Sequence, residues 1–256
     1  MITAIDFGLL LAPFCAGLLV LATHVPLGRE VLRRGIIFID LAIAQVAGLG
    51  VMAARVAGWG DAEGGMDLAT QATAVVAAVA GALLLTWSGR RWPEIQEALI
   101  GLLFVVSACI GILLLAHNPH GGEHLRDLLA GQILWVSWAQ LLLPAIIYAI
   151  VLAVWFRLRS RLGDVGFYLL FALTVTLSVQ LVGVFLVFAS LIAPALASRR
   201  LEGYSGLQRD YLVGISAYAI GLVVSTVVDL PPGPTVVCTL GLAAILGLVA
   251  LPKNAS

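Results

Sequence analysis

Charged side chains are scarce in this sequence. They make up 11% of the 256 residues, against roughly a quarter in soluble domains, while hydrophobic residues reach 61%. Lysine occurs once, at Lys253, and the fourteen basic residues equal the fourteen acidic ones, so the net charge is zero. This composition indicates a chain whose solvent is lipid. The missing basic surplus argues against a nucleic-acid partner, which would require a positively charged patch.

Paired cysteines and catalytic motifs are also missing. Cys15, Cys109 and Cys238 lie scattered in apolar runs, which favours small core residues over a disulfide or a metal site. No Ser/His/Asp set, carboxylate pair or His-Glu-x-x-His motif falls on an apolar run, which disfavours a membrane-embedded enzyme. No polar segment is long enough for a nucleotide-binding domain, so any ATP hydrolysis would need a separate subunit.

Long apolar runs dominate what is present. A helical span needs about 20 mostly apolar residues. An overlong run, Phe167–Ser198, has Gly183 near its middle, and we expect it to form a hairpin of two short helices. The chain is therefore predicted to be an all-α, polytopic transmembrane bundle of about nine spans, with residues 1–256 as one domain. The other expected spans are Phe7–Leu27, Gly35–Gly58, Leu68–Ser88, Ile95–Ala116, Trp138–Phe156, Tyr211–Val228 and Thr235–Leu251.

Basic residues in short loops favour the cytoplasmic side of a membrane. Twelve of the fourteen fall on one side of the expected spans, and only Arg55 and Arg126 do not. The acidic segment Asp61–Asp67, the His-rich segment His117–Asp127 and the turn Asp229–Pro234 fall on the other. This asymmetry predicts an N-terminus outside and a C-terminus inside.

Few ionisable or strongly polar residues lie within the spans, where they are expensive. Asp40 and Gln45 share the second span, but five residues on an ideal helix place them about 140° apart. Each could belong to a transport pathway or make a structural hydrogen bond to a neighbouring helix. Gln71, Gln132 and Gln180 are expected to be such interhelical contacts.

Imidazole and carboxylate groups are concentrated outside the membrane. His117, His120, Glu123 and His124 have the chemistry that zinc or manganese binds, although a polar loop would also contain such residues. His24, near the inner end of the first span, is expected to be a helix-end residue, with metal ligation as the alternative.

Four blocks resemble the permeases of ATP-binding-cassette (ABC) importers for zinc and manganese. Pro26–Gly35 is similar to the family's Leu-Gly followed by a basic turn, and Asp127–Ser137 is similar to its Leu-x-Gly-x-Leu-x-Val-Ser block. Leu181–Ala195 resembles its Val-Gly-x-Leu-Leu-Val…Leu-Ile-x-Pro-Ala signature, and Asp229–Pro234 its Asp-x-Pro-x-Gly-Pro turn. The blocks occur in the family's order and extend from the first span to the last.

The resemblance implies a permease in a bacterial plasma (inner) membrane. It implies a homodimer or pseudo-dimer with the pathway at its interface, two cytoplasmic ATP-binding subunits and an extracytoplasmic metal-binding protein. The permease itself would have no catalytic site and no permanently bound cofactor, and a divalent metal would be its substrate. The resemblance also implies that the following residues contact the ATPase: Ser198, Arg199, Arg200, Leu201, Glu202 and Gly203.

One departure concerns the family's second span, where an Asp and a His four residues later are associated with metal coordination. Alignment on Gly50 places Leu41 at the Asp position and Gln45 at the His position, with Asp40 displaced by one residue. Leucine cannot ligate, and a glutamine carbonyl is a harder donor than imidazole. Import of zinc or manganese is therefore the leading interpretation. Import of a metal chelate or another small solute is the second, and a scaffold or secondary transporter without ATP is the third.

Overall fold

The computed structural model describes residues 7–59, 68–115, 129, 131, 133–159, 161–201 and 203–250. These residues form helices and connecting turns, and no strand occurs among them, which confirms the all-α prediction for this part of the chain. The α-helices are α1 (Phe7–Arg34), α2 (Ile39–Val56), α3 (Leu68–Arg91), α4 (Gln96–Leu115), α6 (Trp138–Leu158), α7 (Asp164–Val182), α8 (Val184–Ala197), α9 (Gly203–Val228) and α10 (Pro232–Ala250). Two short 3₁₀ turns, η1 (Pro93–Ile95) and η2 (Ile133–Trp135), precede α4 and α6.

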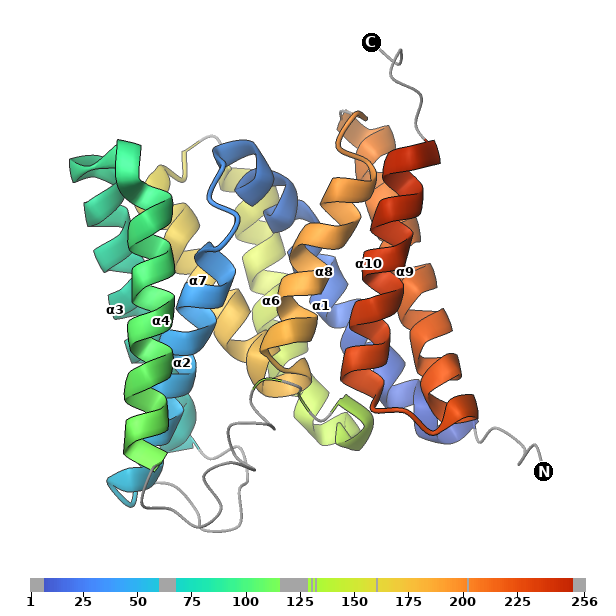
Figure 1. The fold of residues 1–256 in the computed structure, drawn as a ribbon, viewed down its shortest axis with the longest axis horizontal. Coiled ribbons are helices and arrows are strands. Elements are labelled where there is room, and N and C mark those ends of the chain that lie inside the picture. The colour runs from blue at the N-terminus through green and yellow to red at the C-terminus, as the bar shows by residue number, and fades with distance from the viewer. Residues whose placement is uncertain are drawn as a thin grey trace.

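Seven of the described helices are long and apolar enough to cross a membrane. The other two, α2 and α8, contain shorter apolar segments, Ile39–Ala54 and Val184–Ala197. Both run alongside the longer helices in Figure 1. The chain is thus a helical membrane protein, and the count of nine spans stays a prediction.

The overlong run consists of two helices, as predicted. α7 ends and α8 begins at Gly183, whose φ of +83° is a conformation that glycine adopts readily and other residues avoid. Gly131 also has a positive φ, and its Cα lies so close to Val182 that a Cβ there would overlap the Val182 carbonyl group. The chain therefore reverses at Gly183, between α7 and α8, and Gly131 packs closely against this reversal.

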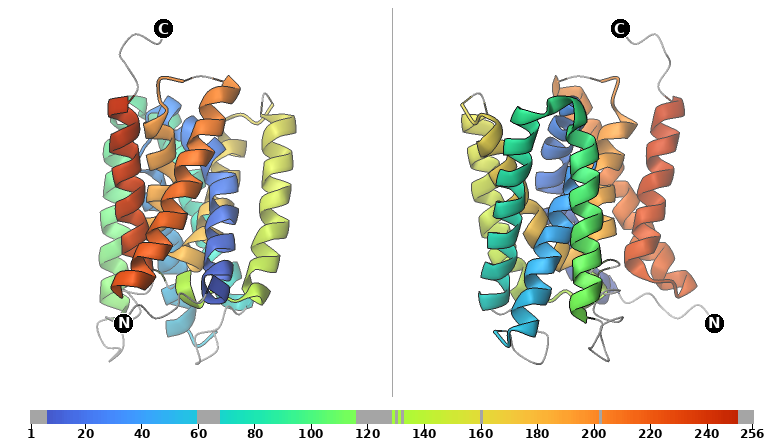
Figure 2. Two further views of the ribbon diagram at one scale, coloured as in Figure 1. Left: turned by 90° about the vertical axis from the view of Figure 1, so that its right-hand side faces the viewer. Right: turned by 60° about the vertical axis from the view of Figure 1, so that its left-hand side comes forward.

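The helices form two groups joined by central ones (Figure 1). α2 packs against α3 and α4 on one side, and α8, α9 and α10 pack against one another on the other. α7 contacts α1, α2, α3 and α8, while α1 contacts α6, α7, α8 and α9. α6 stands at one edge of the bundle, against α1 and α7 (Figure 2). Buried residues concentrate in α1, α2, α7 and α8, which therefore form the core.

Basic turns gather at one end of the bundle, here called the arginine end. It contains the last residues of α1, α3 and α6 and the turn between α8 and α9 (Figure 1). The described chain starts at the opposite end, and α10 finishes at the arginine end (Figure 1). This sorting agrees with the charge pattern of the sequence. Which end faces the cytoplasm stays a prediction.

Close helix packing depends on glycines. The Cα of Gly50 in α2 is so near α3 that a Cβ would come within 2.8 Å of the Ala77 Cβ and the Thr73 carbonyl oxygen. Gly28 lies in the same way against the carbonyl of Leu191, where α1 meets α8. Small residues let helix backbones approach each other in lipid, where no hydrophobic force drives helices together.

Candidate translocation and coupling sites

Asp40 is the acidic residue that α2 buries completely. It lies in the first turn of α2, which begins below the arginine end in Figure 1, and its side chain has no exposed surface. Neither carboxylate oxygen has a hydrogen-bond partner among the described residues. A buried carboxylate without partners is costly unless a proton or cation neutralises it. Asp40 therefore has the property expected of a residue that interacts with a cation in transit.

Two further buried polar atoms lack partners in the described part of the chain: Nε2 of His24 in α1 and Nε2 of Gln180 in α7. The His24 Nδ1 lies 2.9 Å from the Val20 carbonyl oxygen, which orients the ring. His24 is ten residues before the end of α1, about 15 Å at 1.5 Å per residue, whereas Gln180 lies in the last turn of α7 at the opposite end. With Asp40, these groups occupy three depths of the bundle.

The predicted metal ligands are only partly described. Asp40 and Gln45 are both buried in α2. The external candidates His117, His120, Glu123 and His124 lie outside the described residues. Among the residues that are described, no three His, Cys, Asp or Glu side chains come together as a metal-binding group. The metal assignment stays a prediction.

The turn between α8 and α9 contains the predicted coupling residues and is held by α1. Ser198, which follows α8, is fully buried, and its hydroxyl donates a hydrogen bond to the carboxylate of Asp210 in α9. The Arg29 guanidinium forms an ion pair with Asp210, donates to the Ser198 hydroxyl at 2.8 Å and donates to the Leu201 carbonyl at 3.2 Å. We call Arg29, Ser198 and Asp210 the clamp.

The backbone allows this close approach at Gly206. A Cβ at this position would overlap the Arg29 guanidinium and the Leu201 carbonyl. Gly203 begins α9 with a φ of +66°. The turn is thus a fixed structure anchored to the end of α1.

Part of the same turn remains accessible. Arg199 and Tyr204 are exposed, with 75% of the Tyr204 surface accessible, while Ser198 and Gly206 are buried. Arg200 and Leu201 are half-buried, and Glu202 lies outside the described residues. The buried residues of this turn are hydrogen-bonded to α1, and its exposed side chains are accessible to another protein. A protein that docks on the exposed side chains could therefore displace α1 through the turn.

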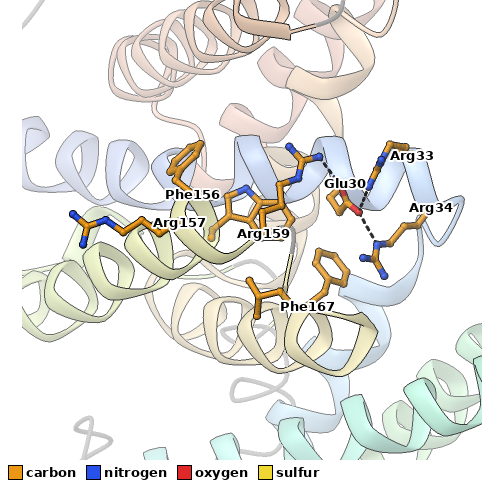
Figure 3. A pocket seen from close by; sticks show the side chains of 9 residues that line it. Glu30, Arg33, Arg34, Phe156, Arg157, Arg159 and Phe167 are labelled. Carbon is orange, nitrogen blue, oxygen red and sulfur yellow. Dashed lines mark hydrogen bonds and ion pairs between the residues drawn. The ribbon is translucent and has the colours of Figure 1, made fainter.

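A second polar cluster surrounds Glu30 at the end of α1, and Figure 3 shows how its side chains converge. Glu30 is 2% exposed, and its Oε1 accepts hydrogen bonds from Arg33 at 2.6 Å and Arg34 at 2.8 Å. Its Oε2 accepts one from Arg159 of α6 at 2.9 Å. Arg34 also bonds to Asp164 at 2.8 Å, which joins α1 to the start of α7.

A cavity of about 450 Å³ opens beside this cluster. Arg34 stacks over the Phe167 ring at 4.3 Å, and Arg159 lies over the Trp155 ring at 5.2 Å. The complete lining is Glu30, Arg33, Arg34, Trp155, Phe156, Arg157, Arg159, Leu162 and Phe167. The cavity is therefore lined by guanidinium groups and aromatic rings.

Sequence reasoning missed the partners in both clusters. Arg29 and Asp210 are separated by 181 positions, and Glu30 and Arg159 by 129. The available signal was the position of Asp210, an acidic residue eight positions into a largely apolar helix. A buried acid in a membrane helix requires a partner, and arginine is the residue that most readily supplies one.

Comparison with protein-family models gives a match over nearly the whole chain. The model of the ABC 3 transport family matches residues 6–167 and 157–251. The chain belongs to this family. The resemblance carried by the four sequence blocks is thereby confirmed, and the family's members are ABC transporter permeases.

Two individual proteins are similar in sequence to this ABC 3 family chain, both at low identity. It is 26% identical over 206 residues to an uncharacterized membrane protein of Cyanophora paradoxa from the ycf23-apcF intergenic region, covering 72% of this chain and 69% of that one. It is 23% identical over 180 residues to a probable metal transport system membrane protein of Chlamydia muridarum (strain MoPn / Nigg). That match covers 62% of this chain and 61% of the chlamydial protein.

Two solved structures share the fold of this ABC 3 family member. A chain of PsaBC from Streptococcus pneumoniae, in complex with Fab, superposes with a TM-score of 0.78 at 19% identity, covering 97% of this chain and 94% of that one. An inward-facing conformation of a metal-chelate type ABC transporter gives a TM-score of 0.68 at 18% identity, with 93% and 85% covered. At these identities the likeness concerns the fold.

Proposed function

We propose that this chain is the membrane-spanning permease of an ABC importer that carries a divalent transition metal, zinc or manganese, into the bacterial cytoplasm. The observation that carries the proposal is the family match from residue 6 to residue 251. The chlamydial relative, named for metal transport, supports the substrate class. The proposed importer consists of two copies of this chain in the inner membrane, two cytoplasmic ATPase subunits and an extracytoplasmic binding protein.

The geometry of the α8–α9 turn supports the proposal that this chain forms the pathway while a separate subunit hydrolyses ATP. A permease without its own ATPase needs a rigid element that receives the movement of a separate subunit. The clamp joins the turn to α1, and α1 contacts α6, α7, α8 and α9. A displacement of the turn would therefore reach the core of the bundle directly.

Asp40 is the residue of the described chain best suited to interact with the cation. Its carboxylate is buried and without a hydrogen-bond partner in the described residues, and it lies one position before the family's Asp position in α2. A metal ion that passes this point would recover part of the desolvation cost of the carboxylate.

The test is elemental analysis of cells that express the complete importer under metal scarcity. We expect accumulation of one metal, and a fall of about tenfold or more in the Asp40→Asn variant, because the variant cannot neutralise a cation. Glu94→Gln is the matched control, since Glu94 is exposed and its loss should leave uptake unchanged. Unchanged content of every divalent metal in the wild type would contradict the proposal.

A metal chelate is the second candidate substrate. The observations that favour it are Leu41 in the family's Asp position and the fold shared with a metal-chelate type transporter. A chelate brings its own ligands and would need few from the protein. Uptake of free metal measured against chelated metal separates the two substrates. A scaffold or a secondary transporter, the third alternative, would purify without an ATPase.

A further inference from the structure

The cavity beside Glu30 has no place in metal import, and its lining points to a ligand of another kind. We propose that it binds the phosphate group of an anionic phospholipid, whose acyl chains lie along the exposed face of α6. The phosphate would meet the guanidinium groups at the arginine end, at the level of the lipid headgroups. This inference is independent of the substrate that the permease carries and of which end faces the cytoplasm.

The charges of the cavity fit an anion. Four arginines line it, Arg33, Arg34, Arg157 and Arg159, and three of them, Arg33, Arg34 and Arg159, are hydrogen-bonded to the carboxylates of Glu30 and Asp164. The cluster is thus positive by two charges. Glu30 is buried beneath these arginines, so it fixes their positions without covering them.

The fixed guanidinium groups retain donors for a ligand. Each guanidinium has five N–H donors, and the Arg33 and Arg159 groups each give one hydrogen bond to Glu30. Their side chains are 68% and 56% exposed, so the other donors are accessible. Guanidinium groups with fixed positions and open donors suit the planar, bidentate recognition of phosphate oxygens.

α6 continues the cavity with a surface for acyl chains. Leu142, Ile146 and Ile150 are 67%, 53% and 58% exposed, and their four-residue spacing places them on one face of the helix. Arg157 follows Ile150 by seven residues, two helical turns, and so continues this face. Phe156 beside it is 61% exposed. An apolar stripe that ends in an aromatic residue and an arginine matches the change from acyl chain to headgroup in a bilayer.

Figure 3 shows the polar part of this surface. Arg33, Arg34 and Arg159 converge on Glu30, while Arg157 extends away from them. The cavity meets the stripe at Arg157, which belongs to the cavity lining and also continues the exposed face of α6. Basic pockets between transmembrane helices are known binding places for anionic headgroups. A free phosphate ion would use the arginines but would gain nothing from the stripe.

The experiment uses the full chain in detergent with three probes: phosphatidylglycerol, which is anionic, phosphatidylcholine, which is zwitterionic, and inorganic phosphate. Retained lipid is counted by native mass spectrometry, and the thermal midpoint is measured with each probe. We expect the wild type to retain phosphatidylglycerol over phosphatidylcholine by about thirtyfold, given about 1 kcal/mol for each of Arg33 and Arg157 near a headgroup. The Arg33→Gln/Arg157→Gln variant should lose this preference.

The matched control is Arg90→Gln/Arg91→Gln, which removes two arginines at the same end of the bundle, on α3. It should keep the preference. Arg157→Gln alone leaves the Glu30 hydrogen bonds intact and should reduce the preference about fivefold, so the test does not depend on the folding of the double variant.

Three results would overturn the proposal. Equal retention of the two lipids by the wild type would show that the cavity does not recognise the charge of the headgroup. Equal stabilisation by inorganic phosphate would assign the site to a free ion. A disulfide-linked dimer formed by Ile146→Cys in the bilayer, without retained lipid, would assign the α6 face to a second copy of the chain.

Discussion

At the residue scale, the described part of this chain treats its buried charges in two ways. Asp210 and Glu30 are buried and satisfied, because arginines donate to them: Arg29 of α1 to Asp210, and Arg33 and Arg34 of the same helix, with Arg159 after α6, to Glu30. Asp40 is buried without a partner among the described residues. Partnered carboxylates stabilise contacts between helices, whereas an unpartnered one costs stability and is retained where function requires it. This contrast distinguishes the structural acids from the candidate transport residue.

The clamp gives a prediction at this scale. Arg29→Ala should lower the free energy of unfolding by about 3 kcal/mol, because it leaves the Asp210 carboxylate, which has no exposed surface, without its ion pair. Asp210→Ala should cost less, because the Arg29 side chain is 24% exposed and keeps its hydrogen bond to the Leu201 carbonyl. The double variant should cost less than the two single changes together, with a coupling energy above about 1 kcal/mol. Thermal unfolding in detergent measures all three variants. Arg161→Ala, an exposed arginine at the same end, is the control and should change little. Additive single effects would show that the pair does not interact.

At the element scale, the sequence predicted the presence of the helices better than their contacts. Two ends differ from the expected ones, because α1 continues past Leu27 to Arg34 and α9 begins at Gly203 rather than Tyr211. Hydropathy and Gly183 located the α7–α8 break, and the positions of the arginines located the arginine end. These properties are local. A run of apolar residues enters the lipid because of its own composition, and a glycine permits a positive φ because it has no Cβ. The partners of Ser198 and Glu30 depend on the rotation of packed helices, which no local pattern encodes. The sequence could therefore name the coupling segment by resemblance but could not find the arginine that holds it.

The attachment of α6 gives the prediction for this scale. α6 stands at the edge of the bundle, where it packs against α1 and α7, and the Tyr148 hydroxyl makes a short hydrogen bond with the Ser178 hydroxyl of α7, both of them buried. Tyr148→Phe should lower the free energy of unfolding by about 1 kcal/mol and increase hydrogen exchange in α6. Tyr204→Phe, at an exposed position, is the matched control. Equal exchange of α6 in the two variants would mean that packing alone holds this helix.

At the scale of the whole molecule, the bundle combines a core of α1, α2, α7 and α8 with outer helices that expose large apolar side chains. Its fold is shared with PsaBC over almost the whole chain. The clamp and the Glu30 cluster both lie at the arginine end, and both include residues of α1. The end of α1 is therefore the place where a cytoplasmic ATPase and the bilayer would both act on the permease.

The central claim is that ATP hydrolysis by a separate subunit drives metal through this chain. Its most direct test is metal uptake into proteoliposomes that contain the chain with its ATPase and binding protein. With ATP supplied on the arginine side of the membrane, we expect accumulation of zinc or manganese against its gradient, and none when the ATPase is inactivated by mutation. Accumulation that persists without ATP hydrolysis would contradict ATP-driven import and identify a secondary transporter.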